Sequence, residues 1–472
     1  MVQSSNAEKI QSTNGLNQNQ NQRPFGMRDK IGYMFGDFGN DFFFLLVASF
    51  LMVYYTDVLG ISASLVGLIL LIARVWDAFA DVTWGRFMDT RKATKHGKYK
   101  PWFYRMSFPM VIFGILMFVQ IPGMSSGFYT AFAFITYLIW GTLFSTVNMP
   151  YGSMASVISN NPIDRASLST FRTVGAMMAS LIVNAIGPIV LFVNNEASGS
   201  RFFMISLVFA VLSVICFTLS YKLTTERVTM TESQEQKLDI RSTLKGVVRN
   251  KPLIILLAAS LTFLVLSFLM SAVNVYLFKN YFGFAGALSF IGIIQPVAVF
   301  ILAPAVKPLV IKFGKREIAA VGLLVASIVY GSLYFMNGLS PIQFIAISSI
   351  GMFGFAIFNL VIWAFVTDAI DYQEYITGNR EDATVYSIYS FARKIGQALA
   401  GGLGGVVIGA VGYNANLPEQ TKETLEGIYM LGTLVPAILC FVVFLLLLVY
   451  PLNKKRLAEL SEKLEIKRQA KL

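Results

Sequence analysis

The sequence predicts an all-α membrane protein with twelve transmembrane helices in two bundles of six. Four observations lead to this prediction. Hydrophobic residues make up 55% of the 472-residue chain, the mean hydropathy is +0.62, and apolar stretches recur along almost its whole length. Only 14% of the residues are charged, whereas soluble globular domains carry about 25%. The chain is therefore too poor in charge to cover a surface that faces water.

Twelve apolar stretches are each long enough to cross a bilayer, which takes roughly 20 residues of α-helix. A backbone inside hydrocarbon finds no water, so each stretch must form a helix that satisfies its own peptide groups. The pattern contains none of the short alternating segments that are typical of a transmembrane β-barrel. The predicted helices cover residues 31–55, 64–87, 102–121, 127–147, 171–193, 202–221, 253–278, 283–302, 318–335, 342–366, 386–411 and 428–452.

Polar segments divide the chain into five predicted parts. The first is rich in Gln, Asn and Ser without an apolar period, which is typical of a disordered tail rather than of a signal peptide. The longest polar connection separates the two groups of six helices. The parts are a cytoplasmic tail (1–30), an N-terminal bundle (31–221), a cytoplasmic middle loop (222–251), a C-terminal bundle (252–452) and a basic tail (453–472).

A weak internal repeat supports this division. The sequences GRFMDTRKATKHGK (85–98) and VIKFGKRE (310–317) follow the second and the eighth helices, which are counterparts in the two groups. Two six-helix halves with a site between them near the middle of the membrane are common in transporters. Within the middle loop, residues 240–248 have the pattern of a short amphipathic helix on the inner membrane surface.

Basic residues gather in alternate connections. The formal net charge of +12 comes from Lys and Arg after the second, sixth and eighth helices and in the C-terminal tail, while the opposite connections hold few basic residues. The positive-inside rule then places both termini in the cytoplasm and the chain in the plasma membrane. Because topology and the lipid bilayer account for the charge, no nucleic-acid partner is predicted.

The composition also excludes several kinds of chemistry. His96 is the only histidine, so no site with several histidine ligands can form, and no enzyme activity or cofactor is predicted. Cys216 and Cys440 lie in apolar stretches, where buried thiols are normal. The glycines at 401, 402, 404, 405, 409 and 412 lack the Lys of a phosphate-binding loop, so they indicate close helix packing instead of a nucleotide site.

Ionisable residues within membrane helices are costly and usually functional. In the second helix, Arg74, Asp77 and Asp81 are spaced by three and four residues and so share one face. Two carboxylates one turn apart in an apolar bundle need a positive partner. Either a bound Na⁺ or a proton on one carboxylate meets this need, and the pair would ligate a metal only if the ion is Na⁺. The alternative is a structural Arg74–Asp77 ion pair, with Asp81 reaching the cytoplasmic interface.

Asp41 in the first helix and Arg172 at the start of the fifth predict a polar substrate site. Carboxylate and guanidinium groups hydrogen-bond well to sugar hydroxyls, although a simple interhelical salt bridge would explain the same pair. Asp37 lies nearer the inner end, where it would cap the helix or extend to the interface. Lys394 in the eleventh helix either neutralises the acidic face or snorkels to the interface.

Seven motifs occur in order along the membrane region. The motifs are GDFGNDF (36–42), YYTDVLGIS (54–62), ARVWDAFADVTWG (73–85), GKYKPW (97–102), STVNMPYGSM (145–154), LSTFR (168–172) and VTDAIDYQEY (366–375). Together they resemble the glycoside–pentoside–hexuronide:cation symporters of the major facilitator superfamily, a bacterial group that includes melibiose permease. The resemblance covers almost all of residues 32–452 and implies the major facilitator fold.

The resemblance also implies roles for single residues. In this family the second, fourth and eleventh helices form the cation site, and the first and fifth helices bind sugar. The matching residues here are Asp77, Asp81, Ser145 and Lys394 for the cation, and Asp41 and Arg172 for the sugar.

Four positions depart from melibiose permease. Asn148 replaces an aspartate shared by sugar and cation, so Na⁺ binding should weaken relative to H⁺, although the amide oxygen can still coordinate. Gly152 and Asn359 replace two aromatic residues of the galactoside site, and Asn40 replaces a lysine. A ring that stacks on a sugar must then come from elsewhere, and Trp363, one turn beyond Asn359, is the predicted substitute.

The sequence therefore predicts a secondary active symporter that imports a sugar glycoside, pentoside or hexuronide with H⁺ or Na⁺ by alternating access. Cation binding at Asp77 and Asp81 would favour the conformation that binds sugar through Asp41, Asn148 and Arg172. The alternative is a lipid flippase, such as a phospholipid translocase of similar topology. A flippase would need charges that bind lipid headgroups and a lateral opening between its helices.

Overall fold

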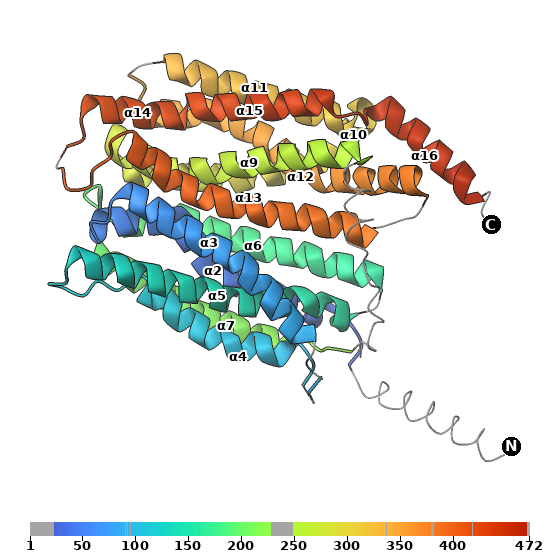
Figure 1. Ribbon diagram of the computed structural model, residues 1–472, viewed down its shortest axis with the longest axis horizontal. Helices are drawn as coiled ribbons and strands as arrows, with labels where there is room; N and C mark the ends of the chain where they lie inside the picture. Colours follow the sequence, from blue (N-terminus) through green and yellow to red (C-terminus); the bar gives the residue numbers. More distant parts are fainter. Residues whose placement is uncertain are drawn as a thin grey trace.

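The computed structural model describes residues 23–89, 91, 93–94, 96–159, 161–227, 249–336, 338–378, 382–417 and 419–469. Most of these residues form long helices that run side by side (Figure 1). We call residues 23–227 the N-terminal half and residues 249–469 the C-terminal half. The long helices of the N-terminal half are α2 (Met27–Val53), α3 (Ala63–Asp89), α4 (Lys100–Leu116), α5 (Ser126–Ile158), α6 (Pro162–Leu191) and α7 (Gly199–Leu223).

The C-terminal half repeats this arrangement. Its last membrane segment is divided at Thr433 into two helices, α14 and α15. The helices are α9 (Lys251–Tyr276), α10 (Leu288–Phe313), α11 (Lys315–Phe335), α12 (Pro341–Thr377), α13 (Asp382–Ala410), α14 (Lys422–Gly432), α15 (Leu434–Val449) and α16 (Lys454–Gln469). The short elements are η1 (Tyr54–Val58), η2 (Leu277–Tyr281), η3 (Ala285–Ala287), β1 (Phe192–Val193) and β2 (Glu196–Ala197).

The predicted multi-pass helical membrane architecture is confirmed. Ten helical segments in the described part of the chain are long and apolar enough to cross a membrane. The other two predicted spans, 102–121 and 386–411, correspond to α4 and α13, which are not among these ten. Helix α4 has only 17 residues, slightly fewer than a typical span of roughly 20. The count of twelve spans therefore stays a prediction.

A strand hairpin and a C-terminal helix were not predicted. Strands β1 and β2 form an antiparallel hairpin between α6 and α7, where the sequence analysis predicted only the flanking helices. The turn residues Asn194 and Asn195 have φ of 49° and 66°, a conformation that Asn tolerates better than most residues. The basic tail forms helix α16, whose Leu460 and Leu464 are buried. The amphipathic helix predicted at 240–248 lies outside the described residues.

The two halves are locally similar where α2 and α9 end. Each of these helices continues into a π-helical turn of five residues, η1 and η2. A glycine in the left-handed region follows each turn, Gly60 at φ 70° and Gly283 at φ 65°. This conformation strains residues that have a Cβ. The matching breaks agree with the weak repeat that the sequence predicted.

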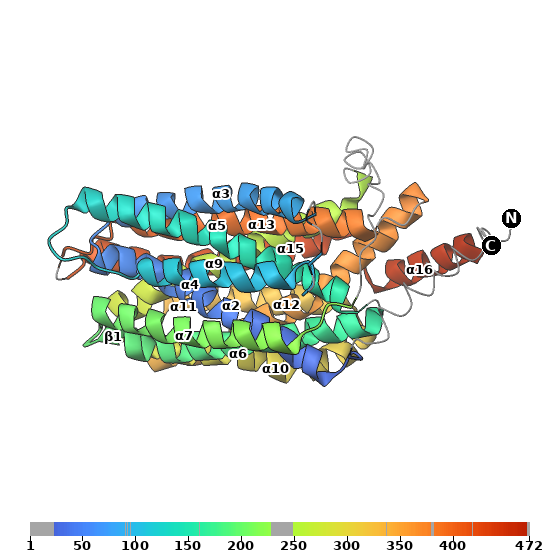
Figure 2. The ribbon, with the colours of Figure 1, turned by 90° about the horizontal axis from the view of Figure 1, so that it is seen from below.

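Polar contacts between η1 and η2 join the halves at the end of the molecule opposite α16 (Figure 2). Asp57 of η1 forms an ion pair with Lys279 of η2, and both side chains are largely buried. The Tyr413 hydroxyl donates to Asp57 Oδ1 at 2.9 Å, and the hydroxyl oxygens of Thr56 and Tyr276 lie 2.9 Å apart. These contacts close this end of the molecule.

Helices α3 and α13 pack closely across the halves, as the glycines between 401 and 412 predicted. A Cβ added to Gly405 would lie 2.5 Å from the Gly67 Cα, and one on Gly409 would lie 2.0 Å from the Ser64 hydroxyl oxygen. Any side chain at Gly405 would therefore push the helices apart, because the obstacle is backbone. The glycines therefore allow close helix packing, and this packing places α13 against the charged face of α3.

We expect Asp57→Asn to loosen the closed end, because Lys279 would lose its only carboxylate among the described residues. Removing one partner of a buried ion pair typically costs about 3–5 kcal/mol. Spin labels at Ser62 and Phe284, one in each half, would report the change as a longer distance in pulsed electron resonance. The matched control is Glu426→Gln, which breaks an exposed pair with Lys422 near the same end. An unchanged distance distribution in Asp57→Asn would contradict the closing role.

Candidate functional site

A polar cavity of about 280 Å³ lies where α3 and α13 meet α2, α5 and α6. Four aspartates and two arginines line it, so most of the charged residues singled out in the sequence gather at one place. Its lining residues are Asp37, Asn40, Asp41, Phe44, Arg74, Asp77, Asp81, Phe144, Ser145, Asn148, Arg172 and Gln397. The cavity thus contains most of the predicted cation-site and sugar-site residues of α2, α3, α5 and α6, with the exception of Gly152.

Asp77 is placed to hold a small cation. Its Oδ2 lies 3.7 Å from Arg74 Nη1, which is longer than a hydrogen bond. Its Oδ1 is buried and has no hydrogen-bond partner among the described residues. Oδ1 faces α5, since a Cβ added to Gly141 would lie 2.3 Å from it. A buried acceptor without a donor is unfavourable, so a proton or a bound cation would satisfy it.

The structure agrees in part with each of the two hypotheses for this face of α3, the cation site and the structural ion pair. The Arg74–Asp77 ion pair is present, as the structural alternative predicted. Asp81, however, lines the same cavity as Asp77. The loose ion pair leaves one oxygen of Asp77 for another partner, and Asp81 lies close enough to share the cavity with it. Both features suit a site that accepts a cation.

Arg172 forms its ion pair with Asp37, not with Asp41. The Arg172 Nε donates to Asp37 Oδ1 at 3.0 Å, and the guanidinium carbon lies 5.2 Å from the centre of the Tyr151 ring. The prediction that Asp37 caps the helix or extends to the interface is therefore wrong, because its side chain is only 6% exposed and paired. Asp41 makes no ion pair within the described part of the chain, and its carboxylate faces the cavity.

Three predicted sugar-site residues lie elsewhere. Gly152, Asn359 and Trp363 do not line either of the two cavities described in this subsection. Trp363 is 43% exposed and packs edge-on against Tyr389, with the Arg393 guanidinium 5.3 Å from its ring centre. Their roles in sugar binding therefore stay predictions.

The last predicted cation-site residue, Lys394, lies in α13, but its side chain falls outside what the structure describes. Gln397, three residues later in α13, lines the polar cavity and was missed by the sequence analysis. Its spacing of three from Lys394 places the two on one helical face, which was a usable signal. Phe44, three residues after Asp41, was missed in the same way, and its ring stacks on Phe144 with centres 5.6 Å apart.

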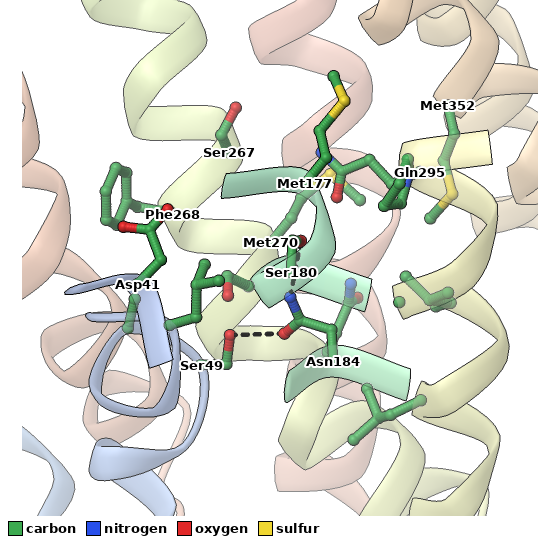
Figure 3. Close-up of a pocket in the computed structure, with 18 of the residues that line it drawn as sticks. Asp41, Ser49, Met177, Ser180, Asn184, Ser267, Phe268, Met270, Gln295 and Met352 are labelled. Atoms are coloured by element: carbon green, nitrogen blue, oxygen red, sulfur yellow. Dashed lines mark hydrogen bonds between the residues drawn. The ribbon is translucent and has the colours of Figure 1, made fainter. Parts of the chain in front are cut away.

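A second cavity of about 460 Å³ lies between the halves, bounded by α2, α6, α9, α10 and α12. It adjoins the polar cavity, because Asp41 and Phe44 line both. On one wall, the Ser49 hydroxyl donates to Asn184 Oδ1 at 2.9 Å, and Asn184 Nδ2 donates to Ser180 Oγ at 3.2 Å (Figure 3). The sequence analysis missed these residues because single hydroxyls and amides are common in membrane helices.

Comparison with known proteins agrees with the fold and identifies the family. The family described as MFS/sugar transport protein matches residues 32–454. The chain is 32% identical to the glucuronide carrier protein homolog of Escherichia coli (strain K12), over 92% of this chain and 94% of that protein. It is also 32% identical to the isoprimeverose transporter of Lactiplantibacillus pentosus, over 92% of this chain and 91% of that protein.

The fold is similar to that of a solved transporter. The crystal structure of a D-xylose–proton symporter superimposes with a TM-score of 0.65 at 14% identity, over 91% of this chain and 98% of that one. The motifs, the family match and the two relatives agree across the membrane region. The predicted relationship to the glycoside–pentoside–hexuronide carriers is confirmed, and the chain belongs to the MFS/sugar transport protein family.

Proposed function

We propose that the protein is a secondary active symporter that imports a sugar together with H⁺ or Na⁺ in the bacterial plasma membrane. The observation that carries the proposal is the unpartnered, buried Asp77 Oδ1 in the same cavity as Asp81 and Asp41. A buried acceptor without a donor is unfavourable, and a bound cation or a proton would satisfy it. The positive-inside pattern of the sequence supports a cytoplasmic location for both termini.

The cation would lie between Asp77 and Asp81. Among the described residues, no three or more His, Cys, Asp and Glu side chains lie close enough together to hold a metal ion, so Na⁺ would need neutral oxygens as well. Ser145 and Asn148 line the same cavity and can supply a hydroxyl and an amide oxygen. For H⁺, protonation of one carboxylate relieves the repulsion between the two and supplies a hydrogen-bond donor.

The sugar would lie beside Asp41, Asn148 and Arg172. Asp41 offers acceptors to sugar hydroxyls, and Arg172 offers N–H donors that its pair with Asp37 holds in one orientation. Asn40, whose buried Oδ1 has no partner among the described residues, adds a further acceptor. Coupling follows from the shared cavity, because a cation bound at Asp77 changes the net charge of the cavity in which the sugar binds. Such linkage is reciprocal, so sugar must also strengthen cation binding.

Alternating access would proceed by rocking of the two six-helix bundles about this site. The structure is closed at the end of η1 and η2, where Asp57 and Lys279 pair. Opening that end requires the pair to separate, while the other end closes. A lipid flippase of similar topology was the alternative. The sugar-transporting relatives do not favour it, and sugar-dependent cation influx into vesicles would separate the two functions.

We expect Asp77→Asn and Asp81→Asn each to abolish accumulation of sugar against its gradient, because neither variant can bind the coupling cation as the wild type does. Binding and exchange of sugar should persist, since Asp41 and Arg172 remain. The measurement is uptake of labelled sugars into vesicles with an imposed proton or sodium gradient. Glu462→Gln, at an exposed position of α16, is the control. Wild-type accumulation in either variant would refute the coupling role.

Gly141→Ala tests the site without replacing a charged residue. The new Cβ would lie 2.3 Å from Asp77 Oδ1 and force the carboxylate to turn. We expect the apparent affinity for the coupling cation to fall by about tenfold, equivalent to about 1.4 kcal/mol. The matched control is Gly331→Ala, whose Cβ would meet only Ala437 at an ordinary 3.7 Å. Equal cation dependence in the two variants would show that Asp77 Oδ1 does not bind the cation.

A further inference from the structure

We propose that the β1–β2 hairpin is a latch that holds the two halves together at the closed end, and that this latch must release before the end can open. The latch is the side chain of Asn195, which lies in the turn of the hairpin and binds the backbone of the connection between η2 and η3. The inference rests on the proposed alternating access. It adds a second closing contact to the ion pair between Asp57 and Lys279.

Asn195 joins the two halves through both polar atoms of its amide. Its Nδ2 donates to the Lys279 carbonyl oxygen at 2.7 Å, and its Oδ1 accepts from the Ala285 N–H at 2.7 Å. Both partners are backbone groups, so their positions depend on the fold of the connection and not on a side-chain rotamer. Gly283 lies between them in the chain, and its left-handed φ of 65° turns the backbone there. The amide therefore binds both sides of one turn of the C-terminal half.

The hairpin fixes the direction of this side chain. Val193 pairs with Glu196 in the antiparallel register, so Asn194 and Asn195 alone form the turn. Both turn residues have positive φ, as two-residue hairpin turns of type I′ require. Asn194 is exposed, whereas Asn195 is half-buried. The same turn thus leaves one asparagine in the surroundings and directs the other to the C-terminal half.

The latch joins two walls of the larger cavity. The hairpin connects α6 to α7, and η3 leads directly into α10. Helices α6 and α10 both line the cavity between the halves, and they are in close contact, because a Cβ added to Gly292 would lie 2.4 Å from the Asn184 carbonyl oxygen. A path from the closed end into the cavity requires these helices to separate. Their separation would break both hydrogen bonds of Asn195.

The latch and the ion pair hold the same short element in different ways. Asp57 binds the side chain of Lys279, whereas Asn195 binds the carbonyl oxygen of the same residue. The amide carries no charge, so salt does not screen its hydrogen bonds as it screens an ion pair. The latch should therefore retain part of the closure in Asp57→Asn, and loss of both contacts should open this end further than loss of either one.

The test removes the amide without straining the turn. Asn195→Gly eliminates both hydrogen bonds, and glycine adopts positive φ readily. Spin labels at Ser200 and Ile342, exposed positions of the N- and C-terminal halves, would report the distance across this end by pulsed electron resonance. The purified full chain would be used, with both native cysteines replaced by serine. We expect the ratio of open to closed molecules to rise by about tenfold, the effect of losing two hydrogen bonds to backbone groups.

Asn194→Gly is the matched control, because Asn194 lies in the same turn with a similar backbone (φ 49°) and an exposed side chain. Its distance distribution should equal that of the wild type. Ala285→Pro removes one bond from the other side of the contact, since proline has no N–H, and the first position of a helical turn tolerates proline. It should raise the ratio by about threefold. In Asn195→Gly it should have no further effect, because the bond is already lost.

Equal distance distributions in Asn195→Gly and Asn194→Gly would overturn the proposal, and so would independent, additive effects of Asn195→Gly and Ala285→Pro. Gel filtration and the melting temperature would show that each variant is folded. If Asn195→Gly does not fold, an unchanged ratio in Ala285→Pro would still refute the latch. These measurements use neither sugar nor a cation gradient. Absence of sugar-driven cation influx in the wild type would refute the proposed symport instead, so the two failures are distinguishable.

Discussion

Charge balance inside an apolar helix bundle is the constraint on which the rest of this structure depends. Four carboxylates and two guanidinium groups line one small cavity, and each ionised group there needs a partner because hydrocarbon offers none. Arg172 Nε pairs with Asp37 Oδ1 at 3.0 Å, whereas Arg74 Nη1 lies 3.7 Å from Asp77 Oδ2. The acidic groups therefore outnumber the described positive groups of the cavity, which favours the entry of a cation.

The architecture brings this cavity together by close backbone contact. Glycines at the crossing of α3 and α13 allow a helix of the C-terminal half to approach the charged face of α3. Gln397 thereby joins residues that lie more than two hundred positions earlier in the chain. The ion pair between η1 and η2 holds the same halves together at one end. The polar cavity and this end of the molecule thus each depend on contacts between the halves.

The two adjoining cavities divide the chemistry between them. The smaller one contains the charges and suits a cation and a hydroxyl-rich ring, while the larger contains amides, hydroxyls and phenylalanine rings. Asp41 lines both cavities, so it joins the charged part of this region to the part between the halves. A change at Asp41 would affect both parts together.

The sequence predicted the membrane class, the helical architecture and the gathering of Asp41, Asp77, Asp81, Ser145, Asn148 and Arg172. These follow from hydropathy, from the spacing of residues on one helical face, and from motifs. The glycines of α13 were also interpreted correctly as packing residues. Helix α16 and the β1–β2 hairpin were missed, because short or charged segments form there only through contacts with neighbours.

By itself the sequence determined which segments had to be buried in a membrane, because burial follows from composition. It also determined which ionisable side chains within those segments were too costly to be there without a role, because this follows from local spacing. Only the tertiary structure decided that Arg172 pairs with Asp37, that Trp363 lies away from the two cavities, and that Ser49, Asn184 and Gln295 share one cavity. Partner choice depends on the rotation and crossing of helices distant in the chain, and a periodic pattern within one helix does not specify them.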